Sequence, residues 1–211
     1  MNKLLTTFAA FTALAVIVAC DSTDSIAGDS ATAPVVGQSA PGFTLPDADG
    51  KQVSLADFRG KTVVLEWHNP GCPFVQKHYG SGNMQKTQAS ATKDGVVWLS
   101  INSGAPGKQG HMNGAEAREM LSKNGAQPAA YLLDPSGVVG RSYDARTTPH
   151  MYIVDAAGTL VYAGGIDDKP TANPKDIAGA RNHVLAALAE LKAGKPVSMA
   201  TSRPYGCAVK Y

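Results

Sequence analysis

Cys72 stands where an apolar strand meets the start of a helix. Residues 64–67 are mostly apolar, a turn of Asn-Pro-Gly follows at 69–71, and Pro73 falls in the first helical turn, where proline forfeits no intrahelical hydrogen bond. A thiol at a helix N-terminus faces unpaired backbone N–H groups and the positive end of the helix dipole, and both favour the thiolate. The setting predicts a nucleophilic sulfur. A buried, inert cysteine that packs as a small hydrophobe is the alternative.

The stretch from Glu66 to Cys72 resembles the active-site segment of thioredoxin-like proteins. Cys72 matches the first cysteine of their CxxC motif, and Val75 stands where the second would be, so a resolving thiol must come from elsewhere. The resemblance implies that Glu66 is a buried acid beneath the thiol that helps to move a proton, since a carboxyl group removed from water has a raised pKa. The alternative for Glu66 is a strand residue that points to solvent.

Residues 147–155 resemble the cis-proline loop of the same superfamily, which leads directly into a strand. In that family the loop lies against the active-site cysteine and pairs its backbone with the substrate chain. The resemblance therefore implies a cis bond before Pro149 and substrate-binding roles for Thr148 and Pro149. His150 follows them; we expect it to line the same substrate-binding loop and to be the histidine that tunes the thiol.

Three histidines, His68, His78 and His150, lie in or near these two segments. A thiolate with imidazoles can bind copper or zinc. Their spacing matches no compact ligand motif, and a copper chaperone of this fold is expected to carry CxxxC, which Val75 and Gln76 do not supply. We therefore expect supporting or surface histidines and neither a metal nor another cofactor.

The chain departs from true peroxiredoxins around the cysteine. Those proteins carry PxxxTxxC, whereas Asn69 stands three residues before Cys72 and Leu65 stands seven before it. The threonine that helps to activate peroxide is thus absent from its place. Residues 37–211 instead resemble a peroxiredoxin-like bacterial group (redoxin, alkyl hydroperoxide reductase/thiol-specific antioxidant) that has a single active-site cysteine at the first CxxC position.

The first twenty residues predict a targeting signal. Lys3 precedes an apolar stretch that ends at Cys20 in a sequence resembling the lipobox of bacterial lipoprotein signal peptides. We expect a lipoprotein signal peptide at 1–19, a lipidated Cys20 and a flexible tether at 20–36, which is rich in Ser, Thr, Ala and Asp. The alternative is an ordinary secretory signal cleaved near Ala19.

Lipidation of Cys20 would leave Cys72 and Cys207, which are 135 positions apart, in a compartment that permits disulfides. Three states stay open for these two residues: a reversible disulfide formed during turnover, a purely structural disulfide, and two free thiols.

Strand-like runs rich in Val, Ile, Leu and Tyr recur along the chain, with helical patterns between them. Strands are expected at 62–67, 96–101, 130–133, 150–154 and 159–162, a hairpin turn at 49–50, helices at 72–92, 113–124 and 174–194, and a short helical turn within 136–143. This order predicts an α/β protein with a thioredoxin-like fold, in which helices flank a central mixed β-sheet on both faces. We expect one domain at 37–194 and a tail at 195–211 that drapes over the surface and carries Cys207.

The 211 residues include 44% hydrophobic residues and carry a formal net charge of +2 without a long basic run. One core and no nucleic-acid partner are expected. We interpret the chain as an exported thiol–disulfide oxidoreductase, anchored to a bacterial membrane by lipid and facing the periplasm or the cell exterior. Cys72 is the expected nucleophile and Cys207 the candidate resolving thiol, with a protein thiol or disulfide as substrate and an unidentified electron donor.

Two alternatives to this function remain. One is a thiol peroxidase that reduces hydroperoxides. The other is a non-enzymatic module with the same fold that binds copper or a peptide.

Overall fold

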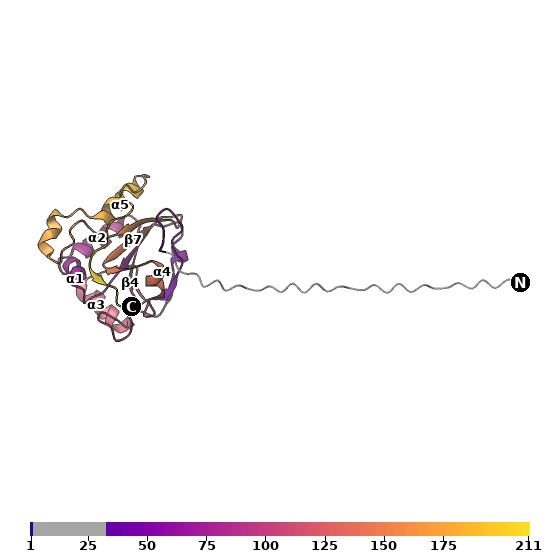
Figure 1. Cartoon of the computed structure of the whole chain (residues 1–211), viewed down its shortest axis with the longest axis horizontal. Helices are drawn as coiled ribbons and strands as arrows, with labels where there is room; N and C mark the ends of the chain where they lie inside the picture. Colours follow the sequence, from indigo (N-terminus) through magenta and orange to yellow (C-terminus); the bar gives the residue numbers. More distant parts are fainter. Residues whose placement is uncertain (2–32) are drawn as a thin grey trace. The chain divides into compact units, whose positions relative to one another are not determined.

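The computed structural model describes Met1 and residues 33–211 (Figure 1). Cys20, the expected signal peptide and most of the expected tether lie outside the described residues. Among the residues described, no helix combines the length and the apolar character that a membrane crossing needs.

A five-stranded mixed sheet forms the centre of the folded unit, in the order β5-β4-β3-β7-β8. Its strands are β3 (Val63–Trp67), β4 (Val97–Asn102), β5 (Ala130–Leu133), β7 (His150–Val154) and β8 (Leu160–Gly164). The first three are parallel, β7 is antiparallel to β3, and β8 is antiparallel to β7. β3 is buried along its whole length, as is typical of a strand with neighbours on both sides and cover on both faces.

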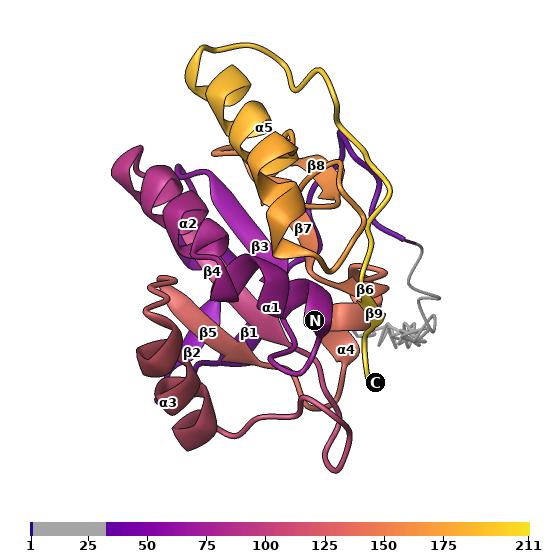
Figure 2. The ribbon, with the colours of Figure 1, turned by 90° about the vertical axis from the view of Figure 1, so that its left-hand side faces the viewer.

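Helices cover both faces of this sheet, because alternate strand residues point to opposite sides. One face carries α1 (Pro73–Gly80), α2 (Asn83–Lys93) and α5 (His183–Lys192), which pack in one apolar cluster with Val64 and Trp98 (Figure 2). The other face carries β1 (Thr44–Pro46), β2 (Gln52–Ser54), the 3-10 helix η1 (Leu55–Phe58) and α4 (Val138–Ser142), which pack with Leu65 and Trp67. α3 (Gly114–Asn124) packs against Tyr131 of the edge strand β5. The expected thioredoxin-like α/β architecture is confirmed.

Two of the expected helices are divided in the structure. The helix expected at 72–92 breaks between α1 and α2 at Gly82, whose φ of +74° lies in the left-handed region that glycine adopts without strain. The helix expected at 174–194 becomes the 3-10 helix η2 (Pro174–Gly179) followed by α5. Asn182 starts α5 because its side chain accepts a hydrogen bond from the backbone N–H of Leu185 at 2.9 Å.

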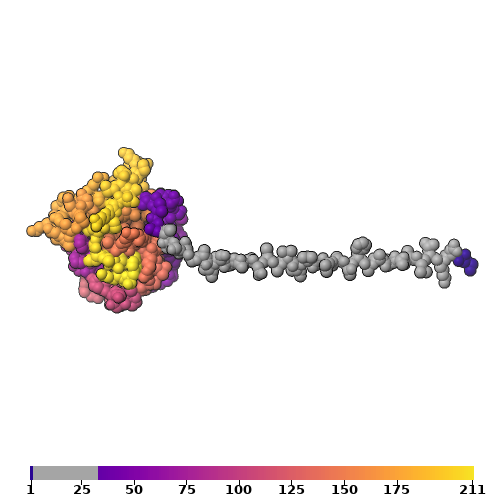
Figure 3. Space-filling view, viewed as in Figure 1, coloured from indigo at the N-terminus to yellow at the C-terminus, as the bar shows by residue number. Residues whose placement is uncertain are grey.

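The C-terminal tail lies across the surface and is also hydrogen-bonded to the folded unit, through pairings that the sequence did not predict. Ala163 of β8 donates its N–H to the carbonyl of Ala200 at 3.1 Å. Further along, β9 (Cys207–Ala208) pairs antiparallel with β6 (Thr147–Thr148) (Figure 2). Figure 3 shows the last residues of the chain as a band across one face of the folded unit. The tail therefore brings Cys207 back to the cis-proline loop.

Candidate active site

A hydrogen-bonded turn at residues 69–72 places Cys72 at the start of α1. The carbonyl of Asn69 accepts the N–H of Cys72 at 3.1 Å, and its side-chain oxygen accepts the N–H of Gly71 at 2.8 Å. Cys72 is the extended N-cap residue, with φ −83° and ψ 123°, and the helix begins at Pro73. The expected strand-turn-helix setting of the thiol is present.

The Cys72 side chain is completely buried, at 0% exposure. Its Sγ donates a hydrogen bond to the carbonyl oxygen of Thr148 at 3.0 Å. Cys207 faces the same place, because it is the register partner of Thr148 in the β6–β9 pair. Both cysteines are free thiols. The tertiary structure thus brings together two cysteines that the sequence separates by 135 positions.

The two thiols have opposite pKa shifts. Burial raises the pKa of Cys72, but hydrogen bonds from the side chains of Cys207 and Thr148 and from the backbone at Cys207 and Val75 outweigh it, so the pKa lies below the ordinary value. Burial, followed by the hydrogen bond to Cys72, raises the pKa of Cys207 to about 11. These shifts favour loss of the proton from Cys72 before loss of the proton from Cys207.

The hydroxyl of Thr148 completes this environment. Its oxygen is buried and has no hydrogen-bond partner among residues 33–211. The same hydroxyl lowers the pKa of Cys72, because it can donate to the sulfur once the thiol has lost its proton. Thr148 thus favours the ionised form of Cys72 over the protonated form.

The bond between Thr148 and Pro149 is cis, as the resemblance implied. His150 follows this bond at the start of β7. Its Nδ1 lies 3.0 Å from the hydroxyl of Tyr152 and accepts the N–H of Arg146 at 3.3 Å. Burial lowers the pKa of His150 to about 4. The groups that lower the pKa of Cys72 include Cys207, Thr148 and Val75, and the tuning role of His150 stays a prediction.

Glu66 is buried on the sheet face that α1 covers, with 0% exposure. Its carboxylate accepts hydrogen bonds from the Tyr79 hydroxyl at 2.9 and 3.0 Å, from Trp98 Nε1 at 2.8 Å and from Ser100 Oγ at 3.0 Å. Burial raises the pKa of Glu66 although these bonds lower it. The solvent-facing alternative for Glu66 is therefore wrong. The donors of these hydrogen bonds are Tyr79, Trp98 and Ser100, so none of the bonds links Glu66 directly to Cys72.

The other two histidines near the thiol are engaged with protein groups. His68 Nδ1 lies 2.8 Å from the Tyr131 hydroxyl, and His78 contacts the Tyr205 hydroxyl at 3.1 Å and the Asn83 side chain at 2.8 Å. Burial lowers the pKa of His68 to about 3 and that of His78 to about 4. Within residues 33–211, no three His, Cys, Asp or Glu side chains gather as a metal-binding group.

A buried polar cluster fixes the tail just before Cys207. The Tyr205 hydroxyl donates to Asp167 Oδ1, and Lys77 Nζ lies 3.8 Å from Asp167 Oδ2 and 5.4 Å from the centre of the Tyr205 ring. Lys77 also donates to the carbonyl of Lys169 at 2.8 Å. The side chains of Lys77 and Asp167 are at most 2% exposed. Their opposite charges neutralise each other in a site that water does not reach.

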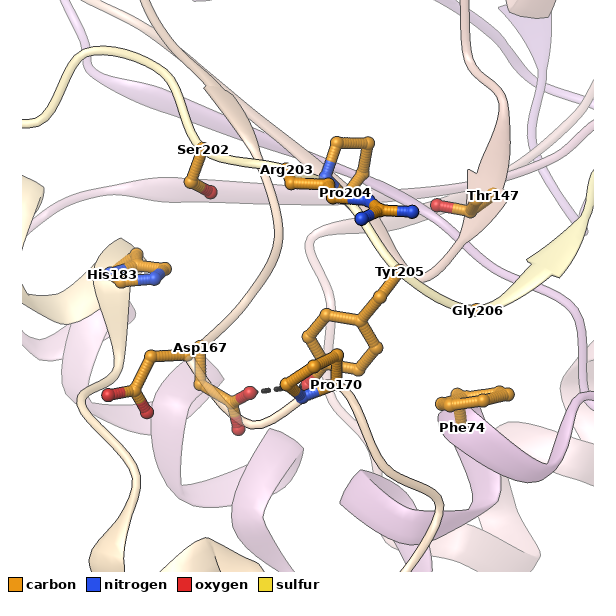
Figure 4. A pocket seen from close by; sticks show the side chains of 11 residues that line it. Phe74, Thr147, Asp167, Pro170, His183, Ser202, Arg203, Pro204, Tyr205 and Gly206 are labelled. Carbon is orange, nitrogen blue, oxygen red and sulfur yellow. Dashed lines mark hydrogen bonds between the residues drawn. The ribbon is translucent and has the colours of Figure 1, made fainter.

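This cluster borders a pocket of about 600 Å³. Phe74 of α1 and Gly206 of the tail lie at one end of the pocket, and Asp167 and His183 lie at the other (Figure 4). The dashed line in Figure 4 is the bond between Tyr205 and Asp167. The pocket therefore opens beside the strand that carries Cys207.

Sequence reasoning identified both cysteines, Thr148 and Pro149, but it missed the residues that hold the tail, Lys77, Asp167, Tyr205 and Gly206. The one local signal was the Tyr-Gly pair directly before Cys207. An aromatic residue and a glycine beside a cysteine in an otherwise irregular segment indicate an anchor and a close backbone approach.

Comparisons with known proteins agree with this architecture. The sequence profile of the AhpC/TSA family matches residues 36–163. Peroxiredoxin Bcp of Escherichia coli K12 is 30% identical over 149 residues, which cover 67% of this chain and 90% of that protein. The thiol-disulfide oxidoreductase ResA of Geobacillus thermodenitrificans is 35% identical over 129 residues, or 61% of this chain and 68% of ResA.

A local match and a solved structure complete the comparison. Forty residues are 55% identical to a Mycobacterium tuberculosis protein provisionally named a peroxiredoxin, and they cover 17% of this chain and only 26% of that protein. The crystal structure of an uncharacterized conserved protein from Geobacillus kaustophilus superposes with a TM-score of 0.70 at 27% identity, covering 84% of this chain and 92% of that one.

Proposed function

The chain belongs to the AhpC/TSA family, and we propose that it catalyses thiol–disulfide exchange through the pair Cys72 and Cys207. One observation carries the proposal: a buried thiol at a helix N-terminus bonds to the carbonyl of Thr148, and the second cysteine is the strand partner of that same residue. Two thiols in this arrangement can pass between dithiol and disulfide. The similarity to the thiol-disulfide oxidoreductase ResA supports the same chemistry.

The proposed reaction transfers two electrons in two exchange steps. The Cys72 thiolate attacks one sulfur of a partner disulfide, which forms a mixed disulfide and expels the partner's other sulfur as a thiolate. Cys207, having lost its proton, then attacks the Cys72 sulfur and expels the second partner thiolate. The partner leaves as a dithiol, two protons are taken up by its thiolates, and Cys72–Cys207 is left as a disulfide that an electron donor must reduce.

We propose that Glu66 accepts or returns a proton during the second step, as the resemblance to thioredoxin-like proteins implies. Its burial, its raised pKa and its place on the Cys72 side of the sheet support this role. Glu66→Gln should slow attack by Cys207 in rapid-mixing experiments and leave the first step unchanged. Tyr79→Phe is the matched control, since it removes one hydrogen-bond donor but keeps the carboxyl group.

Thiol mapping tests the main proposal. The reduced protein is mixed with a small disulfide, quenched with acid and digested, and the cysteine peptides are identified by mass spectrometry. We expect a peptide pair joined through Cys72 and Cys207, and a trapped mixed disulfide at Cys72 in the Cys207→Ser variant. A mixed disulfide that forms at Cys207 in wild-type protein and survives there would contradict the assignment.

A second candidate activity is hydroperoxide reduction, favoured by the identity with peroxiredoxin Bcp and by the unpartnered Thr148 hydroxyl beside the sulfur. The Cys72 thiolate would attack the O–O bond, forming a sulfenic acid and releasing an alcohol or water after protonation. Condensation with the Cys207 thiol would then release water and form the same disulfide. Consumption of hydrogen peroxide, compared with reduction of a protein disulfide, separates the two activities.

We also propose that the protein is exported and held on a membrane through a lipidated Cys20. The lipobox-like end of the apolar stretch supports lipidation at Cys20. Two or more acyl chains attached there would hold the protein stably on a bilayer. Cys20→Ala should move the protein from the membrane fraction to the soluble fraction of the expressing bacterium. Retention of Cys20→Ala in the membrane fraction would contradict lipid anchoring.

A further inference from the structure

Tyr205 of the tail is held from two sides by side chains of the folded unit. Its hydroxyl donates to Asp167 Oδ1 (Figure 4), and His78 Nε2 lies 3.1 Å from the same hydroxyl oxygen. Because a hydroxyl has one hydrogen, which Asp167 receives here, the Nε2 of His78 must carry the proton and act as the donor. The Nδ1 of His78 is then the acceptor for the Asn83 side-chain amide, at 2.8 Å. The hydrogen bonds therefore run in one direction, from the Asn83 amide to the Asp167 carboxylate.

We call the side chains of His78, Asp167 and Tyr205 the tail anchor, and all three are buried. Burial lowers the pKa of His78 to about 4, so this side chain is neutral at neutral pH. Lys77, whose Nζ lies 3.8 Å from Asp167 Oδ2, then balances the charge of the carboxylate. Loss of the Tyr205 hydroxyl would take a donor from Asp167 and the acceptor from His78, where both are almost fully buried. Because a buried polar group that loses its partner is costly, the anchor holds the tail firmly at Tyr205.

The tail anchor joins the two elements that carry the thiols. His78 lies on α1, and Cys72 is the N-cap residue of that helix. Tyr205 lies in the tail, two residues before Cys207. The hydrogen bond between His78 and Tyr205 therefore ties the segment that carries one thiol to the helix that presents the other.

Only a short and closely packed stretch of chain separates the tail anchor from Cys207. A Cβ atom built on Gly206 would lie 2.0 Å from the carbonyl oxygen of Thr148, so the backbone directly before Cys207 runs in contact with Thr148. The same carbonyl oxygen accepts the hydrogen bond from Cys72 Sγ at 3.0 Å, and Cys207 is the pairing partner of Thr148. A shift of Tyr205 would therefore move Cys207 relative to the residue that Cys72 also contacts.

We propose that His78 and Asp167 are positioning residues that act through Tyr205 to hold Cys207 in place for its attack on Cys72. The proposal deepens the proposed function and rests on it for the reaction. In the second step of that reaction, Cys207 loses its proton and its sulfur bonds to the Cys72 sulfur, while the bond from Cys72 to the partner breaks and the partner leaves as a thiolate. Holding the two sulfurs in a fixed relation speeds this step, because it raises the effective concentration of one at the other.

Rapid mixing of the reduced protein with an uncharged dipyridyl disulfide separates the two steps by absorbance. The full chain carries Cys20→Ala, so that only Cys72 and Cys207 can react. The first attack releases one thiopyridone at a rate that depends on reagent concentration, and closure of the Cys72–Cys207 disulfide releases the second at a rate that does not. Tyr205→Phe and His78→Leu should slow the second phase at least about tenfold, because a displacement of about 1 Å can cost about a hundredfold. The first phase needs no attack by Cys207 and should not slow with it.

Further variants separate positioning from a general loss of stability. His78→Gln keeps a side-chain N–H donor and should retain most of the wild-type rate of the second phase. Tyr143→Phe also removes the hydroxyl of a buried tyrosine, one that donates to the carbonyl of Pro41 at 2.7 Å, and should leave the second phase unchanged. Adding His78→Leu or Asp167→Asn to Tyr205→Phe should slow the second phase no further, because Tyr205→Phe already removes both bonds.

Second phases as fast in Tyr205→Phe and His78→Leu as in the wild-type chain would overturn the proposal, and so would equal slowing by Tyr143→Phe. A slowing that disappears as the pH rises would also overturn it, because the residues would then act on the proton of Cys207 and not on its place. Urea unfolding confirms that each variant is folded under the conditions of mixing. Release of a single thiopyridone by the wild-type pair would refute the exchange between Cys72 and Cys207 itself, and the positioning role with it.

Discussion

Replacing Cys207 by alanine removes the side chain whose interaction most lowers the pKa of Cys72. Cys72 is fully buried, so bulk water cannot take the place of this thiol while the tail stays in place. Cys207→Ser is the matched variant, because its hydroxyl keeps a donor at the same position. The pKa of Cys72 should rise in the alanine variant and stay nearly unchanged in the serine variant.

The size of the effect follows from the kind of bond lost. Hydrogen bonds to charged groups contribute ~1.5–3 kcal/mol, and the lower end applies here because sulfur is a weak acceptor. About 1.4 kcal/mol corresponds to a tenfold change in the thiolate fraction at a pH below the pKa. A more basic thiolate is also more nucleophilic, with a Brønsted coefficient of about 0.4–0.5, so the observed rate should fall only about threefold.

Ultraviolet absorbance of the thiolate, followed against pH, measures the titration directly, and reaction with a small neutral disulfide measures the rate. We expect a higher titration midpoint and a slower reaction for Cys207→Ala, with Cys207→Ser close to wild type. An unchanged or lower midpoint in the alanine variant would refute the reasoning that Cys207 stabilises the Cys72 thiolate.

Three other perturbations have defined outcomes. Tyr205→Phe leaves the carboxylate of Asp167 without its hydroxyl donor and should reduce the free energy of unfolding in urea by ~1–3 kcal/mol; no loss would mean that the tail anchor contributes nothing. Because burial raises the pKa of Glu66 in the folded state above its ordinary value of 4.5, the folded protein binds more protons, and stability falls as pH rises above about 4.5. Glu66→Gln should remove that part of the decline in urea unfolding at several pH values, and an equally steep decline in both proteins would contradict it. Thr148→Val should raise the pKa of Cys72 in the same absorbance titration, yet change acid-pH stability by less than about 0.5 kcal/mol, because the hydroxyl is unpartnered beside the thiol.

Local patterns predicted most of the framework that positions Cys72. Strand 130–133 was expected at the residues where β5 forms, and the helix at 113–124 begins at Asn113, whose side chain accepts the N–H of Glu116 at 3.0 Å. These elements depend on periodicity, capping and turn residues within a few positions of one another. The thiol at a helix N-terminus is a feature of the same local kind.

The helix breaks show where local patterns were insufficient. One helix was expected at 72–92, but the backbone turns into the left-handed region at Gly82. A glycine within a helical pattern is compatible with either outcome. Packing of α1 and α2 on the same sheet face decides in favour of the break.

The sequence by itself determined the thioredoxin-like order of elements, the nucleophilic setting of Cys72 and the loop around Pro149, since each is carried by residues close together in the chain. Only the tertiary structure decided where the tail lies and that Cys207 faces Thr148. A segment without periodicity does not identify its pairing partner, and its place is set by the edge of β6, the buried acceptor at Asp167 and the close backbone approach of Gly206 to Thr148. Those three features come from parts of the chain that only folding brings together, which is why the second thiol could be suspected from the sequence but not positioned by it.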